Sequence, residues 1–144
     1  MTLRRDFIQR MLEQLGWALA GVLKLRRAGA HEQAVQQLEA TATGLVGIDL
    51  RMVASVESAT AAALVAEPER LLVLARLCQE RAEIAREQAD PLEAGWRRRA
   101  AELWLEAAGR GAPLDAEARA AVEAEPEEAL SPRARTLRAA LPPR

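Results

Sequence analysis

The 144-residue sequence is poor in the residues that usually build catalytic, metal-binding or disulfide-stabilised sites. It has one cysteine, one histidine and no tyrosine, and aromatic residues make up 3% of the chain. A lone cysteine excludes an internal disulfide, and a lone histidine excludes any site that needs two. The chain is nevertheless long enough to bury a hydrophobic core without such support. We therefore expect an ordinary globular domain.

Long apolar runs and a large net charge are also missing. No stretch approaches the roughly 20 apolar residues of a membrane span, and Asp6 and Glu13 interrupt the N-terminal apolar positions, unlike a secretion signal. The net charge is −1 with 28% charged residues, so composition gives no electrostatic footprint for nucleic acid. We expect a cytoplasmic protein without a membrane or nucleic-acid partner.

Catalytic motifs are lacking as well. The sequence contains neither a glycine-rich phosphate loop nor a nucleophile elbow, so no residues point to an enzyme. Cys78 falls on an apolar helical stripe, which favours a small buried residue over a nucleophile. His31 follows Gly29 at a predicted turn, and we interpret it as an exposed turn residue. We predict no catalytic residue, no cofactor and no resident metal.

The residues that are abundant favour helix. Alanine occurs 32 times, and 19 of the 20 basic residues are arginine. Alanine, leucine, glutamate and arginine are good helix formers, whereas the β-branched and aromatic residues typical of strands are scarce. The composition therefore predicts an all-α fold.

Apolar periodicity predicts a long N-terminal helix over residues 3–28, followed by a second helix over 31–43. The apolar face of the first helix covers well over a third of its circumference, so it needs two neighbours and should pack in the core. The residues of this face are Phe7, Ile8, Met11, Leu12, Leu15, Ala18, Leu19, Val22 and Leu23. Gly29 suits the left-handed conformation just past a helix end.

A second predicted pair, over residues 69–108, has the stronger signals and forms the centre of the fold. Its first helix is apolar on two faces, which predicts that other elements cover both. The corner at Asp90-Pro91-Leu92 combines a capping residue with a proline suited to the first helical turn. The return helix carries one apolar stripe: Leu92, Trp96, Ala100, Leu103 and Ala107. We predict an antiparallel hairpin.

The remaining segments predict shorter helices. Residues 44–68 form an insert with two short helices, for which Asp49 and Ser58 are the expected N-caps. We assign residues 1–112 to a helical-hairpin core. Residues 113–144 carry two short helices, the last opened by Ser131-Pro132. We expect these helices to pack on the core or on a partner. They could form a third hairpin, be mobile in the free chain, or order only against a partner or a second copy, which allows a homodimer.

The two predicted turns share a pattern: residues 27–34 line up with 87–94, each ending on an alanine where the return helix packs back. This pattern resembles tetratricopeptide-type helical hairpins, in which small residues let antiparallel helices nest. The matching small residues are Gly29, Ala34, Ala82, Ala94 and Ala101. The resemblance implies a right-handed helical array that binds proteins, although the turns are 60 residues apart instead of 34. The opening RRDFIQRMLEQLGWALAGVL is also similar to an uncharacterised bacterial family, which implies no activity.

Two charged clusters suggest alternative functions. Glu80, Glu83 and Glu87 have the helical spacing of a divalent-ion site, but nearby arginines favour a solvated, salt-bridged face. Residues 97–99 are three arginines that suit phosphate or RNA, but Glu93 and Glu102 are placed to pair with Arg97 and Arg98.

Two tryptophans remain as candidate anchors for a partner. Trp17 and Trp104 stand away from the main apolar stripes, where aromatic side chains often contact protein partners. The competing interpretation packs both under the insert. The sequence thus favours a non-enzymatic interaction or scaffold module for a protein or peptide, with Trp17, Trp104, Arg97 and Arg98 as candidate contacts. The alternatives are a metal-binding helical bundle and an RNA-binding module.

Overall fold

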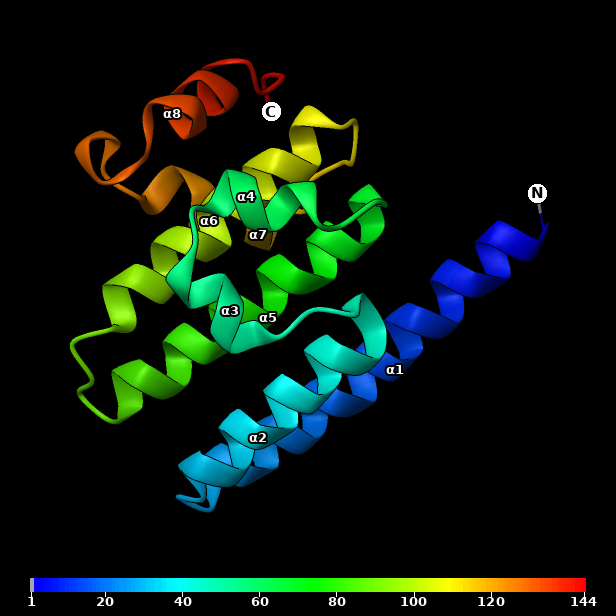
Figure 1. Cartoon of the computed structure of the whole chain (residues 1–144), viewed down its shortest axis with the longest axis vertical. Helices are drawn as coiled ribbons and strands as arrows, with labels where there is room; N and C mark the ends of the chain where they lie inside the picture. Colours follow the sequence, from blue (N-terminus) through cyan, green and yellow to red (C-terminus); the bar gives the residue numbers. More distant parts are fainter. Residues whose placement is uncertain (1) are drawn as a thin grey trace.

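The computed structural model describes residues 2–144, and these contain helices but no strand (Figure 1). The all-α prediction is confirmed. The long helices are α1 (Thr2–Arg27), α2 (His31–Thr41), α5 (Pro68–Glu87) and α6 (Glu93–Gly109). The shorter elements are η1 (Ala42–Val46), α3 (Leu50–Ser55), α4 (Ser58–Ala63), α7 (Ala116–Ala124), η2 (Glu127–Ala129) and α8 (Pro132–Ala139).

The first helix of each long hairpin ends in the same way. The Ala30 N–H donates to the Leu25 carbonyl at 2.8 Å, and 60 residues later the Asp90 N–H donates to the Ala85 carbonyl at 2.8 Å. The residue before each donor has a positive φ, +76° at Gly29 and +52° at Ala89. Both turns therefore end a helix through a left-handed residue, so the predicted repetition of the turn is confirmed.

The return helices do not repeat each other. Ala34 is fully buried in α2, whereas Ala94 is exposed, so the predicted packing role of Ala94 is wrong. Leu92 is also exposed and leaves the predicted stripe. The reason is that α6 begins only at Glu93, after a turn in which the Asp90 carboxylate accepts the Leu92 N–H at 2.9 Å. The later positions of that stripe, from Trp96 onward, are buried as predicted.

The α5–α6 hairpin lies at the centre of the molecule. Helix α2 and η1 pack against α5, while α3, α4, α7 and α8 pack against α6. Both helices are therefore buried on more than one face, which confirms the prediction for α5 and extends it to α6. The largest fully buried side chains of this pair are Leu71, Val73, Leu74, Leu77, Ile84, Leu103 and Leu105.

The insert joins the hairpins through unusual helical geometry. Helix α2 runs directly into η1, a π-helix that ends at Gly47 with φ +78°. Asp49 caps α3 as predicted, since its carboxylate accepts the Arg51 N–H at 2.9 Å. Ser58 does not cap α4: it lies inside the helix, and its hydroxyl donates to the buried carboxylate of Glu102 at 2.7 Å. That capping prediction is wrong because a buried acceptor on α6 takes the hydroxyl.

Arginine side chains close the C-terminal ends of three short helices. The Arg99 guanidinium donates to the Val53 and Ala54 carbonyls at 2.9 and 2.6 Å, at the end of α3. Arg110 does the same for α4, and Arg138 for α7. Helices this short are marginal in isolation, and a cationic fork satisfies carbonyls that have no partner within the helix.

The two C-terminal helices are ordered against α6. Asp115 and Ser131 cap α7 and α8 through their side chains. The Arg133 guanidinium forms two hydrogen bonds with the buried carboxylate of Glu106, at 2.6 and 2.9 Å. Glu102 accepts the Ser131 N–H at 2.9 Å. Of the arrangements expected for this segment, the structure shows packing on the core of its own chain.

Candidate interaction surface

Helix α1 is the least covered of the long helices. Of its described side chains only Met11, Leu15 and Val22 are buried, and its N-terminal turns extend past the other elements (Figure 1). Most of the exposed large apolar side chains in residues 3–144 belong to this helix: Leu3, Phe7, Leu12, Trp17 and Leu23, with Leu64 and Leu92 elsewhere. An apolar surface gathered on one helix is typical of an interaction site.

A groove runs along one flank of α1. Its α1 side carries residues at alternating steps of four and three, which share one face of a helix: Ile8, Leu12, Leu15 and Leu19. The opposite side and floor come from α5, α6, the α6–α7 loop and α7, through Leu72, Val73, Trp104, Pro113 and Ala118. We call this surface the leucine groove. Leu12 lies where the open end of the groove meets its enclosed part, and its side chain is 53% exposed.

The open end of the leucine groove carries charges of both signs. Arg4, Arg5 and Glu13 line it beside Ile8 and Leu12. Arg4 pairs with Glu69 of α5. Within the described residues, Arg5 and Glu13 form no ion pair, so these two charges face solvent at the edge of an apolar surface.

Trp17 stands on the other flank of α1. Its side chain is 74% exposed, at the edge of a shallow groove that α1 forms with Gln37 and Ala40 of α2 and with Leu45 of η1. Trp104, in contrast, is 4% exposed and belongs to the leucine groove. The structure therefore does not bring the two predicted tryptophan anchors together. It leaves Trp17 open and makes Trp104 part of a groove wall.

The other two predicted contacts, Arg97 and Arg98, are held by carboxylates. Arg97 bonds to Glu93, and its Nε donates to Glu125 at 2.8 Å. Arg98 bonds to Glu102 at 3.1 Å. The predicted pairings with Glu93 and Glu102 are confirmed. Glu125 was not predicted, because its approach depends on where the loop after α7 lies.

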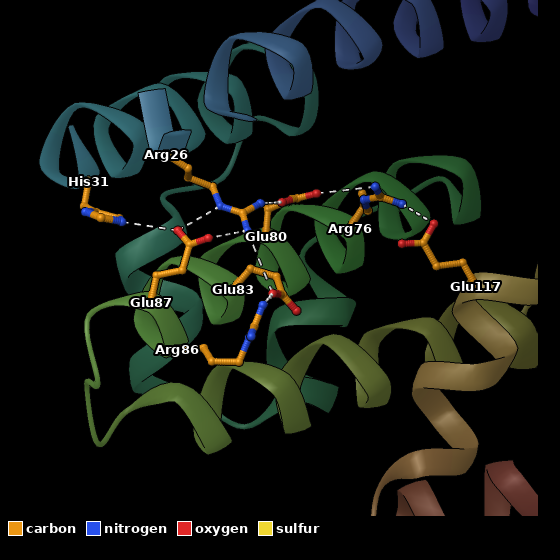
Figure 2. A network of polar contacts seen from close by, with 8 residues as sticks. All are labelled: Arg26, His31, Arg76, Glu80, Glu83, Arg86, Glu87 and Glu117. Carbon is orange, nitrogen blue, oxygen red and sulfur yellow. Dashed lines mark hydrogen bonds and ion pairs between the residues drawn. The ribbon is translucent and has the colours of Figure 1, made fainter. Parts of the chain in front are cut away.

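The three glutamates on α5 converge on Arg26, at the end of α1 (Figure 2). The guanidinium lies 3.1 Å from Glu80 and 3.9 Å from Glu83, and it makes two hydrogen bonds to Glu87 at 2.9 and 3.2 Å. The Arg26 side chain is only 13% exposed. The predicted salt-bridged face therefore exists, and it lies against the other hairpin, while the Glu83 and Glu87 side chains remain 31% and 33% exposed.

The contact between Arg26 and Glu87 shifts the pKa of both groups. The hydrogen bond from Arg26 holds the pKa of Glu87 below its usual value, and Glu87 raises the pKa of Arg26. His31 Nε2 lies 3.2 Å from Glu87 and its side chain is 23% exposed, so the prediction of an exposed turn histidine is wrong. Within residues 2–144, no group of three or more acidic, histidine or cysteine side chains is arranged to hold a metal ion.

Cys78 lies in the centre of the fold. It is fully buried, and burial raises the pKa of its thiol to about 12. The thiol therefore stays protonated near neutral pH, and the prediction of a small buried residue is confirmed.

The leucine groove was not predicted as a site, because Ile8, Leu12, Leu15 and Leu19 belong to the apolar face of α1 that was expected to pack in the core. One signal pointed to it: the apolar face of α1 is wider than one neighbouring helix can cover. In the structure, α2 covers one part of that face and α5 covers only a small further part, so the Leu12 side chain remains exposed.

No protein family, curated protein or solved structure matches this chain. Within residues 2–144, every helix is too short or too polar to cross a membrane.

Proposed function

We propose that this chain is a non-enzymatic protein-interaction module that binds an amphipathic helix in the leucine groove. The observation that carries the proposal is the row of apolar side chains on α1, open at Leu12 and continued by a wall from α5, α6 and α7. Helix-in-groove recognition uses this kind of surface, with partner anchors at three- and four-residue steps.

The chemistry of the groove fits such a partner. Leu12, Leu72 and Pro113 offer apolar surface for anchors from the partner. Two charged side chains, Arg76 and Asp115, also line the groove, and both are already engaged within the chain: Arg76 pairs with glutamates, and Asp115 caps α7. Burying one leucine-sized side chain contributes roughly 1.5–3 kcal/mol, and two or three anchors are needed to exceed the cost of association. Trp104 supplies a rigid aromatic wall whose position does not change on binding, because it is already packed.

Trp17 provides a second anchor point on the opposite flank of α1. An exposed tryptophan beside Ala40 and Leu45 presents a large apolar area at low entropic cost, which is the property of interface hot spots. A partner that bound both flanks would surround the N-terminal half of α1. Arg97 and Arg98 lie outside both grooves and have no role in this proposal.

The hairpin arrangement is proposed to follow the tetratricopeptide design. Two observations support it: the matched turns at Gly29 and Ala89, and the buried small residues Ala34, Ala82 and Ala101. In such arrays one helix of each pair lines the binding surface. In this chain α1 has that role.

The proposal is tested with a displayed library of amphipathic helical peptides, selected on immobilised full-length protein. We expect enrichment of peptides with apolar residues at positions i, i+3, i+4 and i+7, and loss of their binding to Leu12→Gln. The matched control is Leu92→Gln, since Leu92 is also an exposed leucine (63%) but lies at the α5–α6 corner. Peptides that bind Leu12→Gln and the parent chain equally, or an absence of enrichment, would contradict the proposal.

A further inference from the structure

We propose that a second copy of this chain occupies the open end of the leucine groove. Two α1 helices pair antiparallel about a twofold axis that crosses them at the level of residue 10 along the helix, on the face of Ile8 and Leu12. This inference rests on the proposed function, because it names the occupant of the same surface. It differs from the expected homodimer through the C-terminal helices, which here pack on α6 of their own chain.

The spacing of the apolar residues supports a symmetric pair. In an antiparallel pair centred on residue 10, Ile8 of one copy lies level with the partner's Leu12, and the reverse holds by symmetry. Two apolar layers therefore form from two residues per chain. Both residues line the groove at the end where α1 extends beyond the rest of the molecule, so a second helix can approach (Figure 1).

The charges at this end complement each other only across such a pair. Arg5 and Glu13 form no ion pair within the described chain. In the antiparallel arrangement Arg5 and the partner's Glu13 differ by two residues in level, about 3 Å along the axis at ~1.5 Å per residue. An arginine side chain spans that offset easily. Each dimer thus gains two equivalent ion pairs at the ends of its apolar layers.

Net charge and helix stability favour the same arrangement. The chain carries a net charge of −1, so two copies repel each other weakly. The side chains of residues 3–7 are all exposed, and none of this end of α1 is buried against the rest of the chain: Arg4 pairs with Glu69 and Phe7 contacts Arg70 at its edge. Helical turns without packing are marginal in water, and a second helix supplies the missing contacts. A heterologous helix would need a complementary charge pattern, whereas α1 already carries one.

Charge reversal tests the pairing directly. Sedimentation equilibrium on the full chain, from about 1 μM to several hundred μM, gives the dissociation constant of the dimer. We expect Arg5→Glu and Glu13→Arg each to weaken the dimer by about tenfold or more, because symmetry doubles every like-charge contact. The double variant restores opposite charges and returns the dissociation constant to within about threefold of the parent value.

A matched control is Arg10→Glu. Arg10→Glu changes the net charge of the chain by the same amount as Arg5→Glu. Arg10, however, lies on the other flank of α1, beside Phe7 and Leu45. We expect dimerisation of this variant to match the parent. Circular dichroism melts confirm that each variant is folded, which is expected because Arg5 and Glu13 are exposed.

The outcomes separate this inference from the proposed function. The antiparallel pair is overturned if the parent chain remains monomeric at every concentration. It is also overturned if charge reversal at Arg5 and Glu13 leaves the dissociation constant of the dimer unchanged. Peptide selection that still depends on Leu12 would then leave the helix-binding groove in place with a different occupant. Loss of both results would overturn both proposals.

Discussion

The two long hairpins begin with the same turn and have different surroundings. The α5–α6 hairpin is enclosed by α2, η1, α3, α4, α7 and α8, whereas the N-terminal half of α1 has few neighbours. The α5 and α6 helices contribute fully buried leucines, while α1 contributes most of the exposed large apolar side chains. Equal local signals in a sequence therefore do not imply equal burial.

This difference separates stability from recognition within one chain. Burial in α5–α6 provides the free energy of folding, because apolar surface removed from water is its main source. Exposure in α1 leaves apolar surface that only a partner can cover. The Arg26 network joins the two parts, since it connects the end of α1 to three carboxylates on α5 (Figure 2).

The largest expected effect compares one leucine from each hairpin. Leu103 is fully buried in α6, so Leu103→Ala should lower the free energy of unfolding by about 3–4 kcal/mol. Leu12→Ala should lower it by less than about 1 kcal/mol, because Leu12 is largely exposed. Urea denaturation followed by circular dichroism measures both. Similar losses for the two variants would show that the hairpins contribute equally and would end the comparison.

The next effect concerns the link between the hairpins. Arg26→Gln removes the guanidinium from three carboxylates in a partly buried site, and should cost about 1–3 kcal/mol of stability. The control is Arg86→Gln: Arg86 pairs only with Glu83 and is largely exposed, so we expect an unchanged urea midpoint. Hydrogen exchange should speed up in α1 and α2 of the Arg26 variant more than in α6. Uniform acceleration would instead mean that the molecule unfolds as one unit.

The turns provide a smaller and opposite pair of effects. Ala89 adopts a positive φ, which costs an alanine free energy that glycine avoids, so Ala89→Gly should raise stability by about 0.5–1 kcal/mol. Gly29→Ala should lower it by about 1 kcal/mol for the same reason. Thermal melts of the two variants should shift in opposite directions. A fall in stability with Ala89→Gly would show that the alanine methyl group packs usefully at that corner.

The smallest effect is a dependence on acid. The pKa of Glu87 is held below its ordinary value by the hydrogen bond from Arg26, so its folded state binds protons less readily than its unfolded state. The contribution of Glu87 to the free energy of unfolding is therefore fully present above the usual glutamate pKa of about 4.3. It is lost as the pH falls through the lower pKa that Glu87 has in the folded state. Glu87→Gln should have a flatter stability profile in this range. Identical profiles for the parent and the variant would remove Glu87 from the acid response.

Several features of the fold were predictable because they depend on local chemistry. The cap at Asp49, the stop at Gly29 and the pairing of Arg97 with Glu93 involve residues a few positions apart. Errors appeared where a distant group intervened. Ser58 bonds to Glu102 of α6, and His31 meets Glu87 of α5, so neither keeps the role that its neighbours in sequence suggested.

The candidate site was less predictable than the fold. Trp17 was a candidate partner anchor because it stands apart from the apolar stripe, with packing under the insert as the alternative, and it is exposed. Trp104 was selected by the same argument and is buried, because the loop and helix after α6 cover it. Leu12 was assigned to the core and is 53% exposed, because the residues across the groove, among them Leu72 and Pro113, cover it only in part. Periodicity gives the direction of a side chain but not the presence of a neighbour.

The sequence by itself determined the helical class, the ends of most helices and the repetition of one turn, since these follow from propensity, capping and backbone conformation within a few residues. Only the tertiary structure decided which apolar faces are covered, which carboxylates Arg26 joins, and where a groove stays open at Leu12. Those outcomes depend on how helices far apart in the sequence pack, because burial and ion pairing are properties of neighbours in space.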